Sequence, residues 1–283
     1  MADKEIVVIT NCGEEIGFGT ALVFAKDEGK RFKVWATVTD ERQGQTLKEE
    51  AGSLLDDTIF IRKMKMEETS IEETVKDIIE RDGRIDILIV NTFNVGTFGI
   101  FDYEPFNDSH PSFELNFFGP TRLLQLVVPQ MKSKKKGRIL VITTPVAMAG
   151  CPFSEIYSAS IGSLEHMCEP LATVCRKSNV LLSIVQSDCT SSPAVDWIMQ
   201  FSRDFNLGYA EDKQIATMMK NLLEHRRGHV AQKKSTSVDE LASYLRTLVD
   251  EPSPLLHYYT SDEMKKLAAE IYTHPEISLD NFA

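Results

Sequence analysis

Short apolar runs alternate with amphipathic segments along most of the chain. The runs consist mainly of β-branched and aromatic residues, which favours strands buried on both faces. The segments between them place apolar residues three and four positions apart, which is typical of a helix with one buried side. Strands are predicted at residues 6–9, 32–37, 58–61, 85–90, 138–143 and 180–186. Helices are predicted at residues 20–25, 70–81, 113–131 and 157–175.

This order of elements predicts an α/β fold. Because strands with two apolar faces need helices on both sides, we expect a doubly wound parallel sheet. Residues 1–192 are expected to form the core sheet and its helices, and residues 193–283 a substrate loop and a C-terminal helical extension. Helices are predicted in that extension at 215–224, 238–249 and 263–272, with a short apolar run at 256–260. No internal repeat divides the chain, so a single domain over residues 1–283 is predicted.

Composition and charge narrow the function. With 283 residues, of which 42% are hydrophobic, the chain can bury a large core. Its net charge of −11 repels polyanions, so we expect no nucleic-acid partner and no attraction to anionic membranes. No apolar run reaches the roughly 18 residues that cross a bilayer. The charged N-terminus leads directly into a strand, without room for a signal peptide, so a cytoplasmic protein is expected.

The cysteines form no metal-ligand pattern. They are odd in number and widely spaced, at Cys12, Cys151, Cys168, Cys175 and Cys189. We therefore expect reduced thiols and no metal site.

A tyrosine one helical turn before an isoleucine is the most informative local pattern. Tyr157 and Ile161 are four residues apart, so they share one face of a predicted helix. A lysine at the second position would lower the pKa of the phenol and make an acid/base pair. Ile161 cannot do so, and an unassisted phenol titrates near about 10.

Several segments resemble one enzyme family. They read FKVWAT at 32–37, GRILV at 137–141, GCPF at 150–153, LEHMCE at 164–169 and PLLHYYT at 254–260. With the predicted strand order they are similar to the short-chain dehydrogenase/reductase family, in the branch of estradiol 17β-dehydrogenase and the photoreceptor retinol dehydrogenases. The resemblance implies a Rossmann-like domain that uses NADP or NAD to oxidise or reduce a hydrophobic alcohol or ketone. It also implies a homodimer formed by the two long helices, with Phe117, Leu124 and Val128 as apolar contacts.

The cofactor positions of the family are altered in this chain. The family loop T-G-x-x-x-G-x-G corresponds to residues 10–17, and of its glycines only the last is present here. Glu15 adds bulk and negative charge where the family holds a pyrophosphate. The resemblance places the eroded cofactor positions at Asn11, Glu15, Gly17, Thr39, Asn91 and Phe93. Thr39 stands where the branch has an arginine for a 2′-phosphate, and Phe93 replaces a glycine beside the nucleotide. We therefore expect no bound cofactor.

The catalytic set of the family is incomplete. Its Asn, Ser, Tyr and Lys correspond to Asn116, Thr144, Tyr157 and Ile161. Three of these positions keep a polar group, but the ammonium is lost. We favour structural roles for the three over a catalytic one: a helix irregularity at Asn116, a strand end at Thr144 and a packed aromatic ring at Tyr157.

Three hypotheses follow. The first is a pseudoenzyme that has lost nicotinamide binding and is retained to bind a hydrophobic small molecule or to act as an interaction or structural protein. Its cleft would be lined by Met148, Phe153 and Trp197, which could equally be core residues. The second is an NADP(H)-dependent steroid or retinoid dehydrogenase with an atypical site. The third is a cofactor-independent enzyme on the same fold. Such an enzyme would need an arginine at position 161, where this chain has isoleucine.

Overall fold

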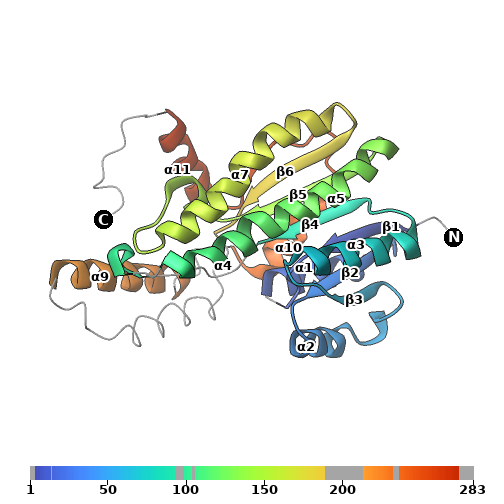
Figure 1. The fold of residues 1–283 in the computed structure, drawn as a ribbon, viewed down its shortest axis with the longest axis horizontal. Coiled ribbons are helices and arrows are strands. Elements are labelled where there is room, and N and C mark those ends of the chain that lie inside the picture. Colours follow the sequence, from blue (N-terminus) through green and yellow to red (C-terminus); the bar gives the residue numbers. More distant parts are fainter. Residues whose placement is uncertain are drawn as a thin grey trace.

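A seven-stranded parallel sheet forms the centre of the molecule (Figure 1). The computed structural model describes residues 4–13, 15–92, 99–103, 106–188, 213–231 and 236–273. The strand order is β3-β2-β1-β4-β5-β6-β7, so the predicted doubly wound parallel sheet is confirmed. The strands are β1 (Glu5–Ile9), β2 (Phe32–Val38), β3 (Ile59–Lys63), β4 (Ile87–Asn91), β5 (Gly137–Thr143), β6 (Val180–Gln186) and β7 (His257–Tyr259).

Helices cover both faces of the sheet. One face packs against α3 (Glu68–Asp82), α5 (Gly119–Lys134) and α7 (Glu155–Arg176). The other packs against α1 (Glu15–Ala25), α2 (Glu41–Ala51) and α10 (Val238–Leu248). The remaining described α-helices are α4 (Ser109–Phe113), α6 (Val146–Ala149), α9 (Lys213–Ala231) and α11 (Asp262–Thr273).

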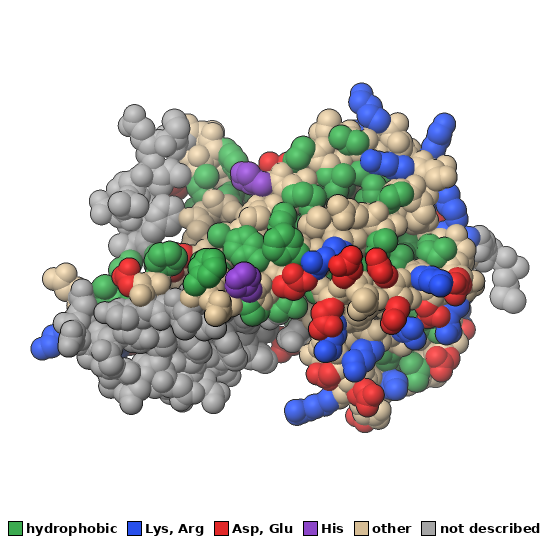
Figure 2. All heavy atoms as spheres, in the orientation of Figure 1, with side chains coloured by type: hydrophobic (Ala, Val, Ile, Leu, Met, Phe, Trp, Pro, Cys, Tyr) green, Lys and Arg blue, Asp and Glu red, His purple; other side chains and the backbone are tan. Residues whose placement is uncertain are grey.

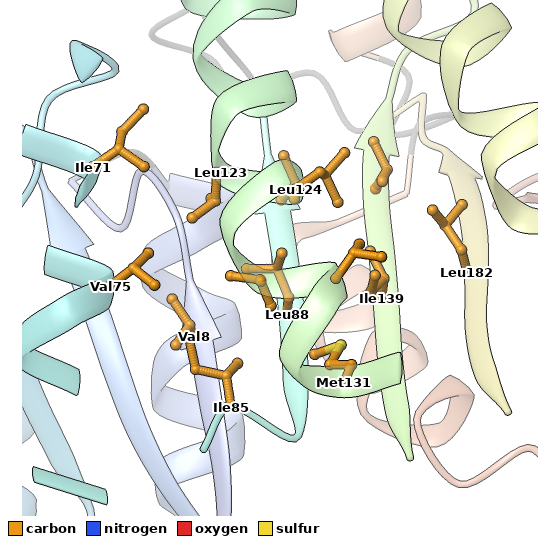
Figure 3. Close-up of a cluster of buried hydrophobic side chains, with 14 of the residues drawn as sticks. Val8, Ile71, Val75, Ile85, Leu88, Leu123, Leu124, Met131, Ile139 and Leu182 are labelled. Carbon is orange, nitrogen blue, oxygen red and sulfur yellow. The ribbon is translucent and has the colours of Figure 1, made fainter. Parts of the chain in front are cut away.

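The central strands are apolar on both faces because both faces are covered. All five residues of β4 are buried. Leu88 and Val90 contribute to the core under α3 and α5, whereas Ile87 and Ile89 contribute to the core under α1 and α10. Figure 3 shows Leu88 among side chains from both the helices and neighbouring strands of the first core. Each fully buried side chain of this kind contributes about 2 kcal/mol to stability.

Most predicted elements are present, with boundaries shifted by a few residues. The helix predicted at 113–131 is present, and it contains a π-helical turn at Glu114–Phe118 between α4 and α5. Helix α2 was not predicted, because its apolar face is narrow and buries only Gly44, Leu47 and Ala51. Helix α7 continues through Pro170, although a proline inside a helix has no N–H to donate to the preceding turn.

Two of the residues that we assigned to a subunit interface belong to the protein's own core. Leu124 and Val128 are only 2% and 6% exposed and pack against the sheet, and Phe117 is partly buried against the same cluster. The assignment of Leu124 and Val128 to a dimer interface is therefore wrong. The homodimer itself stays a prediction, and Phe118 and Leu126 are among the apolar side chains exposed near α5.

The glycine that begins α5 should be sensitive to substitution. A Cβ at Gly119 would lie 2.5 Å from Cβ of Met66 and 2.9 Å from its carbonyl oxygen, so Gly119→Ala should destabilise the fold by about 1–3 kcal/mol. The control is Gly44→Ala inside α2, where the new methyl group would make ordinary contacts at 3.5 Å or more. It should stabilise by about 0.5–1 kcal/mol. Urea unfolding measures both; a neutral Gly119→Ala would contradict the packing of α5 against Met66.

Candidate functional site

The loop after β1 keeps one of the three family glycines, Gly17, and has asparagine in place of the first. Asn11 has φ +55°, a left-handed conformation that asparagine tolerates better than most residues. Gly17 is still required, because a Cβ there would lie 2.4 Å from the carbonyl oxygen of Asn11 and 2.9 Å from Nδ2 of Asn91. The sequence therefore retains the close approach of α1 to the loop.

Asn91 ties this loop to the end of β4. Its backbone N–H donates to Oγ1 of Thr10 at 2.8 Å, and Thr10 Oγ1 donates to its carbonyl oxygen at 3.1 Å. Its side-chain Nδ2 donates to the carbonyl oxygen of Asn11 at 3.4 Å. Strands β1 and β4 are neighbours in the sheet, and the strand order runs in opposite directions on either side of this pair. Open α/β sheets bind ligands at such a switch point. Asn91 therefore has the strand-tying role that its burial predicts.

Gln43 fills the space beside the loop. This side chain of α2 lies so close to Gly13 that a Cβ on Gly13 would lie 2.2 Å from Cδ of Gln43. Its Oε1 accepts hydrogen bonds from the backbone N–H of Thr39 at 3.1 Å and from Oγ1 of Thr39 at 2.7 Å. Thr39 follows β2, where dinucleotide-binding sheets hold the adenosine ribose or its 2′-phosphate. Sequence reasoning missed Gln43 because it did not predict α2.

Glu15 is the first residue of α1 and its side chain is exposed. A carboxylate in the first turn interacts favourably with the helix dipole, so the helix tolerates Glu15 at this position. Phe93 lies outside the described residues.

Helix α7 presents three successive site positions on one face. Tyr157 is half-buried, Ile161 is fully buried, and Glu165 is buried one turn further on. Ile161 therefore occupies the lysine position with an apolar side chain that contributes to the interior.

The π-helical turn brings Asn116 to this helix. Asn116 Nδ2 donates to Ser160 Oγ at 3.1 Å, and Ser160 Oγ donates to the carbonyl oxygen of Tyr157 at 2.8 Å. Asn116 and Tyr157 are thus brought together through Ser160, a residue that sequence reasoning missed. Thr144, just beyond β5, is buried, and its Oγ1 has no hydrogen-bond partner among the described residues. A hydroxyl in this state can bond to a polar group of a ligand.

Glu165 joins α7 to the ends of two strands. Its carboxylate accepts hydrogen bonds from Thr143 Oγ1 and from Gln186 Nε2, the latter at 2.9 and 2.7 Å to its two oxygens. Burial raises the pKa of the Glu165 carboxyl to about 7, although the bonds from Thr143 and Gln186 act in the opposite direction. Sequence reasoning missed this carboxylate, but the four-residue spacing from Tyr157 through Ile161 could have revealed it.

The predicted apolar lining is only partly within the described residues. Met148 is half-buried on α6, and Phe153 is buried with φ +65° and accepts a backbone hydrogen bond from Gly99 at 2.8 Å. Trp197 lies outside the described residues. Two of the three proposed lining residues therefore lie near the end of the sheet that carries Thr144.

Asp188 anchors the C-terminal region to the end of β6. Its Oδ1 accepts hydrogen bonds from Thr236 N–H at 3.2 Å, Thr236 Oγ1 at 2.7 Å and Thr260 Oγ1 at 2.9 Å. Burial acts to raise the pKa of Asp188, but hydrogen bonds from Thr236, Ser261 and Thr260 outweigh it and hold the pKa below its usual range. The carboxylate is thus committed to structural partners.

Among the residues that the structure describes, no group of His, Cys, Asp and Glu could hold a metal ion, and no helix is long and apolar enough to cross a membrane. Cys12, Cys168 and Cys175 are free thiols, and burial raises the pKa of Cys168 to about 12.

Comparison with known proteins identifies the family. The family model described as short chain dehydrogenase matches residues 5–200. The chain belongs to the short-chain dehydrogenase family. It is 27% identical to estradiol 17-beta-dehydrogenase 1 of Rattus norvegicus over 269 residues, covering 94% of this chain and 76% of the relative. It is 32% identical to retinol dehydrogenase 8 of Homo sapiens over 185 residues, covering 65% of this chain and 58% of the relative.

Solved structures agree on the fold. A short-chain dehydrogenase from Streptomyces avermitilis superposes with a TM-score of 0.74 at 18% identity, covering 96% of this chain and 95% of that one. NAD+-bound xylitol dehydrogenase superposes with a TM-score of 0.72 at 19% identity, covering 88% of this chain and 94% of that one. The predicted kinship with steroid and retinol dehydrogenases therefore holds at the level of family, and the solved structures support the architecture alone.

The buried carboxyl of Glu165 should make stability depend on pH. Its pKa rises from 4.5 to about 7 on folding, so the folded state holds the proton more tightly than the unfolded chain does. The protonated carboxyl of Glu165 therefore contributes fully to the free energy of unfolding below the unfolded pKa. This contribution is lost as pH rises through the folded pKa, and the free energy of unfolding falls by about 3 kcal/mol in all. Glu165→Gln should flatten this loss in urea unfolding between about pH 4.5 and 7.5. Glu72→Gln, at an exposed position of α3, is the control. An unchanged slope in the Glu165 variant would contradict the burial of its carboxyl.

Proposed function

We propose that this chain is a non-redox member of the short-chain dehydrogenase family. In this proposal it has lost nicotinamide binding and keeps a cleft for a hydrophobic small molecule beside Tyr157. The described residues of this chain do not fit a nicotinamide dinucleotide at three points.

The burial of Ile161 carries the proposal. The side chain is 0% exposed at the position where the family has its lysine. It offers no ammonium to hold the ribose hydroxyls or to lower the pKa of the neighbouring phenol. The face of α7 that would perform acid/base chemistry therefore keeps the tyrosine without the group that activates it.

Gln43 supplies the second point of misfit. Its amide lies against Gly13 and is held there by two hydrogen bonds from Thr39. An adenosine ribose at the end of β2 would have to displace this side chain and break both bonds. Thr39 also provides no positive charge to bind the 2′-phosphate of NADP.

Glu15 supplies the third. The N-terminus of α1 is the place where a dinucleotide's pyrophosphate would bind. A like-charge contact at about 4 Å with an effective dielectric of about 20 costs roughly 4 kcal/mol. That penalty corresponds to about three decades of affinity.

The groups that remain suit recognition of an apolar molecule with one polar group. Thr144 Oγ1 lacks a partner among the described residues, and the hydroxyl of Tyr157 is carried on the neighbouring helix. Either hydroxyl can donate to a carbonyl or accept from an alcohol. Met148 and Phe153 supply apolar surface at the same end of the sheet. These features support binding, orientation and exclusion of water without proton transfer.

Kinship favours a second candidate function. The rat relative that covers 94% of this chain is named as an estradiol dehydrogenase, and Gly17 of the family loop is retained at a position where a Cβ would not fit. These observations support an NADP(H)-dependent steroid or retinoid dehydrogenase with an atypical site. Family membership favours this candidate over the first, whereas Ile161 and Gln43 favour the first.

A thermal-shift titration separates the two candidates. A cofactor that binds the native state at 100 times its dissociation constant stabilises by about 2.7 kcal/mol, which raises the melting temperature by several degrees. We expect no rise with NADPH or NADH at millimolar concentration. A saturable rise with either cofactor would overturn the non-redox proposal and support the dehydrogenase.

Restoring the family lysine should be costly. Because Ile161 is fully buried, Ile161→Lys places an ammonium in an apolar environment and should destabilise the protein by about 3 kcal/mol or more. Ile161→Val, the matched control, should cost about 1 kcal/mol. Urea unfolding with and without NADPH gives both readouts. A lysine variant that is as stable as wild type and gains stability from NADPH would show that the cofactor groove is still open.

A further inference from the structure

The ends of two neighbouring helices carry a concentration of positive charge. We call this surface the basic end; it comprises Lys132, Lys134, Lys135, Lys136, Arg176 and Lys177. All except Lys132 are exposed. Lys and Arg side chains project at the upper right of Figure 2, over the ends of α5 and α7 in Figure 1.

The two helix ends are joined into one surface. Nδ2 of Asn179 donates to the carbonyl oxygen of Lys135 at 2.8 Å. The strands that follow the helices pair directly, with Gly137 opposite Val180. Lys132 is close enough to Cys175 to influence its thiol electrostatically. The cations of α5 and α7 therefore act on the same region of solvent.

Most of this charge is not used by the fold. Lys134 donates to the carbonyl oxygen of Gly83 at 2.9 Å, and Lys136 forms an ion pair with Glu5 at 3.0 Å. Lys135, Arg176 and Lys177 have no hydrogen bond or ion pair from their side chains within the described part of the chain. Each helix C-terminus carries about half a negative charge. About one cation would balance the negative charge of the two helix ends, and the basic end has six.

The concentration contrasts with the rest of the molecule. The whole chain has a net charge of −11, from which we expected no attraction to anionic membranes. At physiological salt, however, charges separated by more than about 8 Å are largely screened from one another. A partner touching the basic end therefore experiences the local positive charge rather than the net charge.

We propose that the basic end docks on an anionic lipid surface. Five of its six cations are lysines, which act as point charges on flexible stems, whereas defined recognition of a carboxylate is typical of arginine forks. They spread across two helix ends, and Val174, which is 56% exposed, adds apolar surface in the last turns of α7. Diffuse lysine charge beside an exposed aliphatic residue is suited to lipid headgroups.

The topology fixes which end of the molecule would face away from the lipid. The basic end lies at the amino ends of β5 and β6, whereas Thr144 follows the carboxyl end of β5. A strand of this length separates the two ends by roughly 20 Å. A docked molecule would therefore keep the cleft beside Tyr157 open to solution.

Vesicle sedimentation tests the proposal with two matched triple variants. The test variant carries Lys135→Gln, Arg176→Gln and Lys177→Gln. The control carries Lys63→Gln, Lys220→Gln and Lys266→Gln, at exposed positions of β3, α9 and α11, and changes the net charge by the same amount. Vesicles are phosphatidylcholine alone or phosphatidylcholine with one-third phosphatidylserine, in about 0.1 M salt.

The wild type should bind the vesicles that contain phosphatidylserine and should be released by salt. The test variant should bind them roughly 100-fold more weakly, whereas the control should bind like wild type. Absence of wild-type binding, or equal loss in both variants, would overturn the proposal. Binding to soluble polyglutamate without binding to the anionic vesicles would also overturn it, and would assign the basic end to an acidic protein partner.

Discussion

The hydrogen-bonded junction between β1 and β4 determines the shape of the candidate site. Thr10 and Asn91 exchange bonds across the two strand ends, and Asn91 also holds the carbonyl oxygen of Asn11. Gly17 permits this arrangement because only a residue without a Cβ fits against the loop. These contacts are internal to the fold, so they persist whatever binds nearby. They hold the loop in place where asparagine stands at the position of the first family glycine.

The chemistry of the site is less well preserved than its shape. A tyrosine at the start of α7 needs a cation one turn later to work as an acid near neutral pH, and a buried isoleucine stands there. The next turn carries Glu165, whose charge is satisfied by Thr143 and Gln186 at the strand ends. The face of α7 thus changes from a catalytic surface to a packing surface that contains one hydrogen-bonded acid. The polar residues that remain, Asn116 and Thr144, fit either ligand binding or structure.

Sequence reasoning predicted the architecture well because β-branched runs and helical spacing both report burial. It recovered the central strands within one or two residues. It failed for a helix with few buried residues, and for side chains whose partner depends on the direction that a helix face points. Helix α2 has too narrow an apolar face to be recognised, so the position of Gln43 beside Gly13 could not be foreseen. Leu124 and Val128 were assigned to an interface because an apolar stripe does not reveal whether it faces the sheet or a second subunit.

We predict that the protein's own side chains exclude a dinucleotide from the groove at the ends of β1 and β2. Glu15 acts at the phosphate position and Gln43 at the adenosine ribose, and the buried Ile161 removes the cation at the nicotinamide ribose. The most direct measurement is a crystal structure of the protein grown with a millimolar concentration of NADP+. We predict that the amide of Gln43 remains against Gly13 and that no dinucleotide is bound. Density for a nicotinamide ring beside the hydroxyl of Tyr157 would contradict it.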